Sequence, residues 1–272
     1  MTVGPGREQH PTSHPPKLIL LDLDGTLLGT DGEVSDRNSS ALHRAAAAGA
    51  RVVIATGRPP RWLEHLRASI PASIALCCNG GIVLDLDSDV VLASSPVDGR
   101  MLLAAIDGLR DSGIRFSVAV EGLPEFGLAV EPDFPFRSAE VRRAPLGELC
   151  AAYVVKVLIR PEESQGSAIV ERFAADYSDI FTLTRSTNDG LIEISSAGIT
   201  KGAVIARLAG DWGIERADAI AFGDMPNDIE MLSWAGHSVA MGNADDAVKA
   251  MTSEVAAHHD DDGVGRILER WF

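Results

Sequence analysis

Short apolar runs alternate with helix-forming stretches in the first part of the chain. Three runs, the first at Leu18–Leu21, are rich in Leu, Ile, Val and Ala and are bounded by turn residues, which is typical of buried strands. The stretches between them open with helix-capping residues or proline. Strands and helices that alternate in this way predict a parallel, doubly wound sheet. The predicted elements are strands at 17–22, 51–55 and 74–78, a helix from Ser35 or Asp36 to Ala48, and a short helix from Pro59-Pro60 to about Ser69.

The alternation changes after Asn79-Gly80-Gly81. Two apolar runs flank Asp87-Ser88-Asp89 as a hairpin, and the elements after it predict an α+β insertion of three or four strands and two helices. Such a sheet would be covered on one side, leaving its other face free to lie over a cleft. The expected order is a hairpin at 82–86 and 90–94, helix 97–110, strand 115–120, an irregular Pro-rich stretch through Pro145, strand 153–159, helix 164–177, and strands 181–186 and 191–194.

Strand and helix alternate again after Ser195. The chain is therefore expected to be an α/β protein with a doubly wound, Rossmann-like core formed by residues 17–95 and 189–272 and an α+β domain, residues 96–188, inserted into it. The composition of residues 1–16 predicts a disordered tail, and His10 and His14 are expected to be flexible polar residues of that tail without a metal-binding role. The last predicted elements are helix 201–212, strand 219–222, helix 227–234, strand 238–241, helix 244–250, strand 254–257 and helix 264–271.

Composition narrows the classes of function. The 272 residues carry a formal net charge of -15, which argues against binding to nucleic acids or anionic membranes. No run approaches the roughly 18 apolar residues of a membrane span, and the N-terminal segment lacks the apolar centre of a signal peptide. The odd set Cys77, Cys78 and Cys150 has no metal-binding spacing and fits core residues in a reducing cytoplasm. We therefore expect a soluble cytoplasmic protein, monomeric or homodimeric.

Four polar clusters follow predicted strands or begin predicted helices. Because the carboxyl ends of parallel strands converge at one edge of a sheet, all four can meet there. This edge is where open α/β sheets bind their ligands. The clusters are Asp22 and Asp24, Thr56-Gly57-Arg58, Thr200-Lys201-Gly202, and Gly223-Asp224 with Asn227-Asp228.

The two carboxylates after the first strand suit phosphoryl transfer. Asp22 would attack phosphorus and form an aspartyl-phosphate, which splits one difficult displacement into two easier ones. Asp24 would protonate the leaving alcohol and later deprotonate the attacking water. The sequence thus predicts a covalent mechanism with Asp22 and Asp24 as its catalytic residues.

A phosphate substrate would be repelled by the net charge, so local cations must overcome it. Asp224, with Asp22 and the backbone carbonyl of Asp24, would hold Mg²⁺, a hard cation that prefers oxygen ligands. Asp228 would complete or orient that set of ligands.

Phosphate oxygens need donors at the same edge. Thr56 offers a hydroxyl, and Gly57 an unhindered amide at a helix start. Lys201 supplies a compact positive charge.

Each of these residues also has an ordinary structural interpretation. Thr56-Gly57 could be a simple strand-to-helix turn, Lys201 a solvated lysine, Thr200 an N-cap, and Asn227-Asp228 the cap of the next helix. Their joint placement on one edge favours the functional interpretation. Elsewhere the structural one is preferred: acidic residues at 245–246 and 260–262 would charge helix starts, His258-His259 would lie in a loop, and the four tryptophans would pack helices.

The motifs, in their order, resemble the haloacid dehalogenase-like hydrolase superfamily, and within it the Cof-type phosphatases with a large cap inserted after the third core strand. The segments that carry the resemblance are Asp22-Leu23-Asp24-Gly25-Thr26, Ala55-Thr56-Gly57-Arg58, Asn79-Gly80, Thr200-Lys201-Gly202, Gly223-Asp224-Met225-Pro226-Asn227-Asp228-Ile229-Glu230-Met231-Leu232 and Asp262-Gly263-Val264. The resemblance covers the core nearly end to end.

It implies a Mg²⁺-dependent phosphatase in which the Leu23 backbone and Asn227 also contact phosphate, with Arg58 and Asn79 as candidate substrate-binding residues. Ser195-Ser196-Ala197-Gly198-Ile199 stands where family members often carry a proline-containing segment. The cap chooses the substrate in this family, and residues 96–188 contain no motif that maps onto it.

Several functions use this set of residues. Hydrolysis of small phosphomonoesters, such as sugar phosphates or related metabolites, is expected first. The resemblance alone implies that hexose and pentose phosphates rank above nucleotides. A phosphomutase or sugar-phosphate phosphotransferase would need the same core. A phospho-signalling receiver would place its acidic pair first and its acceptor on a middle strand, and a persistent signalling phosphate would not need Asp24. A metabolite-binding protein without catalysis would not need the intact acidic set.

Overall fold

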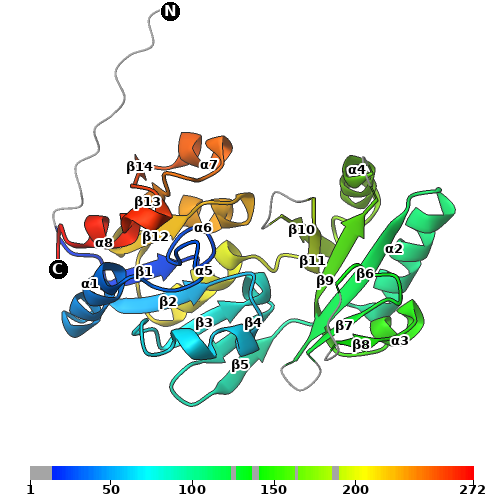
Figure 1. Cartoon of the computed structure of the whole chain (residues 1–272), viewed down its shortest axis with the longest axis horizontal. Helices are drawn as coiled ribbons and strands as arrows, with labels where there is room; N and C mark the ends of the chain where they lie inside the picture. Colours follow the sequence, from blue (N-terminus) through cyan, green and yellow to red (C-terminus); the bar gives the residue numbers. More distant parts are fainter. Residues whose placement is uncertain (1–13, 124–126, 137–140, 163–164, 186–189) are drawn as a thin grey trace, which may run out of the picture.

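The computed structural model describes residues 14–123, 127–136, 141–162, 165–185 and 190–272. It contains two sheets that lie beside each other (Figure 1). Most of the expected N-terminal tail, including His10, lies outside the described residues. Within the described ranges, no helix is both long enough and apolar enough to cross a bilayer.

The first sheet has eight strands in the order β14-β13-β12-β1-β2-β3-β4-β5. Six of them run parallel, and a hairpin extends the sheet beyond them: β4 pairs antiparallel with β3, and β5 pairs antiparallel with β4. The strands are β1 Leu18–Leu21, β2 Arg51–Ala55, β3 Ile74–Cys77, β4 Ile82–Asp85, β5 Val90–Ser94, β12 Ala219–Gly223, β13 His237–Ala240 and β14 Glu254–Val255.

Helices cover both faces of this sheet because side chains of its central strand alternate between two cores. Ile19 and Leu21 pack with helices α1 and α8, and Leu18 and Leu20 pack with α5, α6 and α7. This is the doubly wound arrangement that the sequence predicted. The helices are α1 Asp36–Ala47, α5 Lys201–Asp211, α6 Ile229–Trp234, α7 Asp246–Met251 and α8 Gly263–Leu268. Ser35 caps α1 as expected, its hydroxyl accepting from the amide of Asn38 at 3.2 Å.

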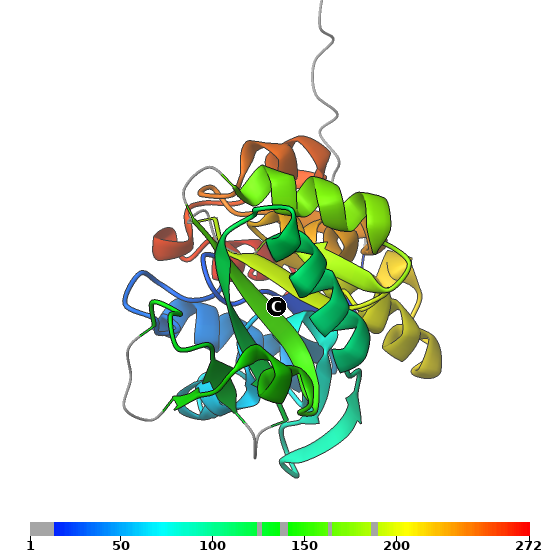
Figure 2. The same ribbon diagram turned by 90° about the vertical axis from the view of Figure 1, so that its right-hand side faces the viewer.

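The second sheet has six strands in the order β10-β11-β9-β6-β7-β8. Its three helices lie on the face turned away from the first sheet, and they stand in front of the strands in Figure 2. Its other face is turned toward the first sheet, as expected for an inserted domain over a cleft. The elements are α2 Gly99–Asp111, β6 Phe116–Gly122, β7 Leu128–Val130, β8 Arg142–Arg143, α3 Leu146–Cys150, β9 Val154–Pro161, α4 Gly166–Asp176, β10 Phe181–Thr184 and β11 Ile192–Ser196.

Three expectations about the elements were wrong. The segment after Pro59 forms two 3₁₀ turns, Pro60–Trp62 and Glu64–Leu66, instead of one short helix, and these short turns still bury Leu63 and Leu66. The Pro-rich stretch contains β7 and β8, and α3 directly follows it, so among the described residues the second sheet has six strands and three helices. Finally, β11 pairs with both β10 and β9, which extends this sheet to Ser196, past the expected boundary at 188.

Candidate active site

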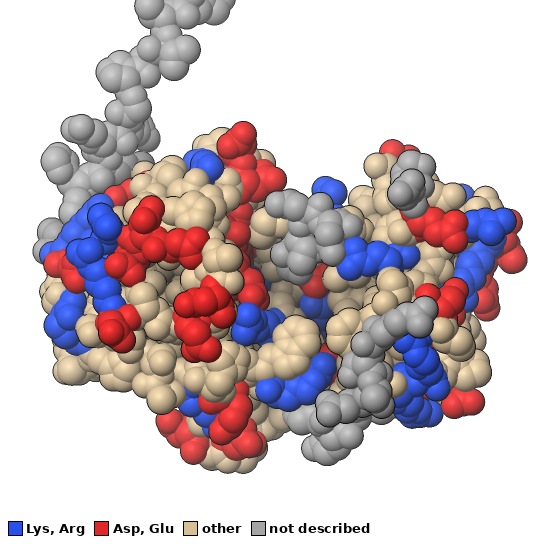
Figure 3. All heavy atoms as spheres, in the orientation of Figure 1, with Lys and Arg blue, Asp and Glu red and all other residues tan. Residues whose placement is uncertain are grey.

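A cavity of about 340 Å³ lies between the carboxyl ends of the central strands and the open face of the second sheet. The space-filling view is hollowed between these two parts, and both acidic and basic atoms are visible there (Figure 3). The lining residues from the first-sheet part are Asp22, Asp24, Gly57, Arg58, Pro59, Arg61, Trp62, Met225 and Asn227, and those from the second sheet and its loops are Glu121, Leu128, Lys156, Leu158, Leu191 and Glu193.

Lys201 connects two carboxylates at the base of this site. It is the first residue of α5, whose N-cap Thr200 accepts from the amide of Ala203 at 3.0 Å. The Lys201 side chain is fully buried and its Nζ donates at 2.6 Å to Asp22 Oδ1 and at 2.6 Å to Asp228 Oδ1. Burial opposes its charge, but the two carboxylates outweigh burial and raise the pKa of Lys201. Lys201 is therefore a fixed cation in the site, not a solvated surface lysine.

Burial and mutual repulsion act on the carboxylates themselves. Burial, followed by the charge of Asp228, raises the pKa of Asp22 well above its ordinary value, against the attraction of Lys201. The same two causes raise the pKa of Asp224 to about 7. Candidate ligand oxygens of Asp22, Asp224 and Asp228 all lie within 4.8 Å of one another. Three crowded carboxylates beside a single lysine form a donor set that fits a hard divalent cation.

Asp228 is already held by the protein on both oxygens. Its Oδ1 accepts from Lys201, and its Oδ2 accepts from the amides of Asp224 and Met225, each at 3.1 Å. A Cβ on Gly223 would lie 2.6 Å from the Cβ of Asp228, so only glycine allows this approach. These contacts favour an orienting role for Asp228 over direct coordination.

Asp24 lies at the mouth of the cavity in an ion pair with Arg58. The guanidinium donates from Nε at 2.9 Å and from Nη2 at 2.6 Å to its two oxygens, and the Asp24 side chain remains 61% exposed. The two residues come from the turns after β1 and β2, which the sequence assigned to separate clusters. Asp24 is thus accessible to solvent, which is compatible with the acid and base role that the sequence predicts for it.

The turn after β2 is held by its own backbone. The fully buried Thr56 donates its amide to Leu76 at 2.8 Å, and its hydroxyl accepts from the amide of Arg58 at 3.0 Å. Gly57 lines the cavity between them. Leu23 is fully buried, and its carbonyl accepts from the amides of the turn that follows it. The structure thus brings the predicted phosphate-binding residues to the same sheet edge as the acidic cluster.

Asn227 lines the cavity and contacts Asn79. Asn227 Nδ2 donates to Asn79 Oδ1 at 3.1 Å. The buried Oδ1 of Asn227 has no hydrogen-bond partner among the described residues. Asn79 adopts the left-handed conformation at φ 57°, which an asparagine tolerates. Asn79 Nδ2 donates to Glu193 at 2.6 Å, so this candidate residue connects the first sheet with the second.

Sequence reasoning missed the polar residues that the second sheet brings to the cavity. Glu121 accepts from both terminal nitrogens of Arg61, at 2.5 and 2.8 Å, and Lys156 forms an ion pair with Glu193. A signal for them was present: Lys156 lies within Val154–Ile159, and Glu193 between two isoleucines, each a lone charge in an apolar strand. Alternation of side chains along a strand places such a charge on the face opposite the core.

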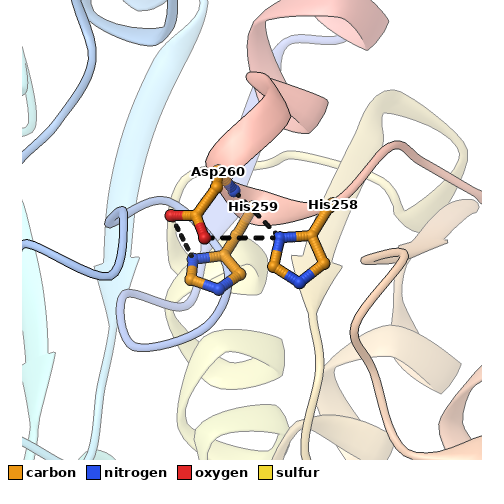
Figure 4. A group of neighbouring side chains, drawn as sticks. All are labelled: His258, His259 and Asp260. Carbon is orange, nitrogen blue, oxygen red and sulfur yellow. Dashed lines mark hydrogen bonds and ion pairs between the residues drawn. The ribbon is translucent and has the colours of Figure 1, made fainter.

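His258, His259 and Asp260 form a second group of potential metal ligands near the C-terminal end of the chain (Figure 4). His259 Nδ1 donates to the carbonyl of Leu28 at 2.7 Å, and Asp260 accepts from the amide and hydroxyl of Thr30, both at 2.7 Å. These bonds lower the pKa of Asp260. The group therefore fastens the loop after β1 to the C-terminal segment, and the structural interpretation of His258-His259 fits it.

Comparisons with known proteins agree with the geometry. The family model described as haloacid dehalogenase-like hydrolase matches residues 19–268. The chain is 30% identical over 270 residues to the 5-amino-6-(5-phospho-D-ribitylamino)uracil phosphatase YitU of Bacillus subtilis, an alignment that covers 94% of this chain and 98% of the relative. It is 28% identical to the pyridoxal phosphate phosphatase YbhA of Escherichia coli, with 93% and 97% covered.

Among solved structures, the phosphatase BT1666 of Bacteroides thetaiotaomicron superposes with a TM-score of 0.82 at 25% identity, over 97% of this chain and 98% of that one. Fold, motifs and relatives confirm the resemblance that the sequence motifs indicated. The chain belongs to the haloacid dehalogenase-like hydrolase family and is a phosphatase of the Cof type.

Proposed function

We propose that this phosphatase hydrolyses small phosphomonoesters through an aspartyl-phosphate formed on Asp22. The observation that carries the proposal is the position of Lys201, buried and bonded at 2.6 Å to Asp22, at the base of a cavity whose mouth holds Asp24. A nucleophile fixed by a cation, with a second carboxylate exposed nearby, is the arrangement that two-step phosphoryl transfer requires.

In the first step a carboxylate oxygen of Asp22 attacks phosphorus and the bond from phosphorus to the ester oxygen breaks. Asp24, protonated, gives its proton to the departing alkoxide. In the second step Asp24, now a carboxylate, takes a proton from water as that water attacks the phosphoryl group, and inorganic phosphate and Asp22 are released. Asp24 must leave its ion pair with Arg58 to act as the acid, so Arg58 is free to contact the substrate during that step.

The metal in this proposal is Mg²⁺, held by Asp22, Asp224 and the Asp24 backbone and oriented through Asp228. When bound, it would neutralise the phosphate charge that the acidic chain would otherwise repel. Thr56, Gly57, Lys201, Asn227 and the Leu23 backbone would hold the phosphoryl oxygens. The unpartnered Oδ1 of Asn227 leaves that amide able to accept a further bond.

Charge pairing in the cavity supports an uncharged leaving group. Among the described residues that line it, each cation faces a carboxylate: Arg58 pairs with Asp24, Arg61 with Glu121, and Lys156 with Glu193. Apart from Arg58, which Asp24 releases in the acid step, a second phosphate would reach a cation of this set only by displacing Glu121 or Glu193. This favours monophosphate esters over nucleoside di- and triphosphates, and the family resemblance places hexose and pentose phosphates above nucleotides. The inserted domain, whose sheet extends to Ser196, would act as the cap that selects among these substrates.

Phosphate esters of a nitrogen heterocycle are a second candidate class. Leu128, Leu158, Leu191 and Trp62 give the cavity an apolar wall, on which a flat ring would pack. The relatives named for pyridoxal phosphate and for a phosphoribitylaminouracil act on substrates with such rings.

A phosphomutase or phosphotransferase remains the alternative reaction on the same core, and a bisphosphorylated product would reveal it. The three buried thiols suit the reducing cytoplasm, where we place the reaction.

The experiment is a screen of phosphorylated metabolites and p-nitrophenyl phosphate for phosphate release with Mg²⁺ and with EDTA. The wild-type protein should release phosphate only with the metal, and Asp22→Asn should abolish turnover. Asp246→Asn, which changes a fully exposed aspartate at the start of α7, is the matched control and should keep full activity. Retained activity in Asp22→Asn would refute the covalent mechanism, and preference for a nucleoside triphosphate would refute the ranking of substrates.

A further inference from the structure

A closed ring of hydrogen bonds joins the second sheet to the phosphate-binding turn after β2. Lys156 Nζ, on β9, donates to the carbonyl oxygen of Gly57 at 3.1 Å and forms an ion pair with Glu193 on β11. Glu193 accepts from Asn79 Nδ2 at 2.6 Å, and the backbone amide of Asn79 donates to the carbonyl of Thr56 at 2.9 Å. The ring therefore returns to the turn where it began.

The members of this ring that belong to the second sheet are deeply buried. Lys156 is 7% exposed and Glu193 2% exposed. Removing two opposite charges from water costs free energy that their attraction only partly restores, so two apolar residues would hold the sheets together at least as well. A buried pair of this kind is better explained by the position it fixes than by the stability it adds.

The group whose position this ion pair fixes is the backbone carbonyl of Gly57, which accepts from Lys156. A carbonyl held by an ammonium group fixes the orientation of its peptide plane, and with it the neighbouring amides of the turn. The other contacts of this turn, with Leu76 and within the turn itself, come from the first sheet. Lys156 adds a contact to this backbone from the second sheet.

We propose that Lys156 is a positioning residue for phosphoryl transfer: it orients the Thr56–Arg58 turn through the Gly57 carbonyl, so that the turn is fully organised only while the second sheet is closed over the first. Glu193 orients Lys156, and Asn79 transmits the position of Glu193 to the other end of the turn. The inference rests on the proposed function, and it assigns Lys156 an effect on the phosphoryl group, not on the leaving group.

Lys156→Met tests this directly, because methionine keeps much of the length and removes the charge and donor. We expect kcat/KM to fall about tenfold, the size associated with one lost hydrogen bond to a charged group. The fall should be equal for p-nitrophenyl phosphate and glucose 6-phosphate, whose leaving groups differ. Inhibition by orthovanadate should weaken by a similar factor, and Lys156→Arg should recover part of the loss.

Glu193→Gln is the second variant, since glutamine can keep the bond to Asn79 while it loses the charge. We expect a smaller loss than in Lys156→Met, and the double variant should be no worse than Lys156→Met because both act through one contact. If Lys156→Met fails to fold, Glu193→Gln alone tests the proposal. A fall in kcat/KM of equal size for both substrates supports the proposal, and an unchanged kcat/KM overturns it.

Arg110→Met is the matched control. Arg110, on α2, pairs at 2.6 Å with Glu131, the residue that follows β7, so both partners of this ion pair lie within the inserted domain. It should lower the melting temperature without changing kcat/KM. A loss in Lys156→Met confined to one substrate would indicate a specificity role and overturn the proposal, as would unchanged kinetics or an equal loss in Arg110→Met. Absence of phosphate release by the wild-type protein would instead refute the proposed function.

Discussion

Replacing Asp224 with asparagine should stabilise the metal-free protein at alkaline pH. Burial and the charge of Asp228 raise the pKa of Asp224 from 3.8 to about 7. Because the folded state binds this proton more tightly than the unfolded state, the free energy of unfolding falls as the pH rises from about 4 through 7. The rise in pKa corresponds to a contribution of at most about 4 kcal/mol to the free energy of unfolding. This contribution is fully present below pH 4 and is lost by pH 8.

An asparagine side chain carries no charge at any pH, so the Asp224→Asn variant should escape that loss. For a chain of this size about 4 kcal/mol corresponds to roughly 8–16 °C in melting temperature. In EDTA, Asp224→Asn should therefore melt well above the wild-type protein at pH 8 and close to it at pH 4.5. Added Mg²⁺ should raise the melting temperature of the wild-type protein at pH 8, by mass action, and leave the variant nearly unchanged.

The assay is thermal unfolding followed by circular dichroism at both pH values, with and without metal. Asp246→Asn serves as the control, because this exposed carboxylate should give no difference that depends on pH. A variant that melts below the wild-type protein at pH 8 in EDTA, or that differs from it equally at both pH values, would refute the reasoning.

Two further substitutions and one measurement of thiol reactivity have outcomes that the structure specifies. Gly25→Ala should lower both stability and activity, measured by thermal melting and phosphate release, because Gly25 has φ +77° and a Cβ there would lie 2.3 Å from Asp224 Oδ2. Burial raises the pKa of Cys78 to about 12 and that of Cys150 to about 11, so neither thiol should react with Ellman's reagent at pH 8 until the protein is denatured; rapid reaction in the native state would contradict their burial. Arg58→Met should reduce kcat/KM by about tenfold in steady-state assays by removing a charged contact to the substrate, and unchanged kinetics would exclude that contact.

The first sheet could be predicted from the sequence because its signals are local. Leu18–Leu21 is apolar throughout, and all four side chains are buried, as a central strand requires. The turns after β1, β2 and β12 carry their polar residues directly after such runs, so strand topology alone brought Asp22, Thr56 and Asp224 to one edge. The roles of these residues stay predictions until the variants are made.

The second sheet was harder because its signals are not local. Leu128–Val130 pairs antiparallel with residues 119–121 of β6, and its three residues are too few to show a period. The partners of Lys156 lie on a loop after β2 and on β11, far away along the chain. Composition shows that a buried charge is unusual in a strand, but only the packed structure shows which carbonyl or carboxylate it meets.

The central position of β1 has a consequence for biosynthesis. Leu18 pairs with Ala219 on one side, and the neighbouring Lys17 and Asp218 are 201 positions apart in the chain. At about 5–20 residues per second, a ribosome needs roughly 10–40 s to add that length. The nascent chain must therefore leave one backbone edge of the apolar strand β1 unpaired during this interval, while the second sheet, which has a core of its own, is already complete. We expect the emerging chain to be most prone to aggregation, and most dependent on chaperones, before β12 leaves the exit tunnel.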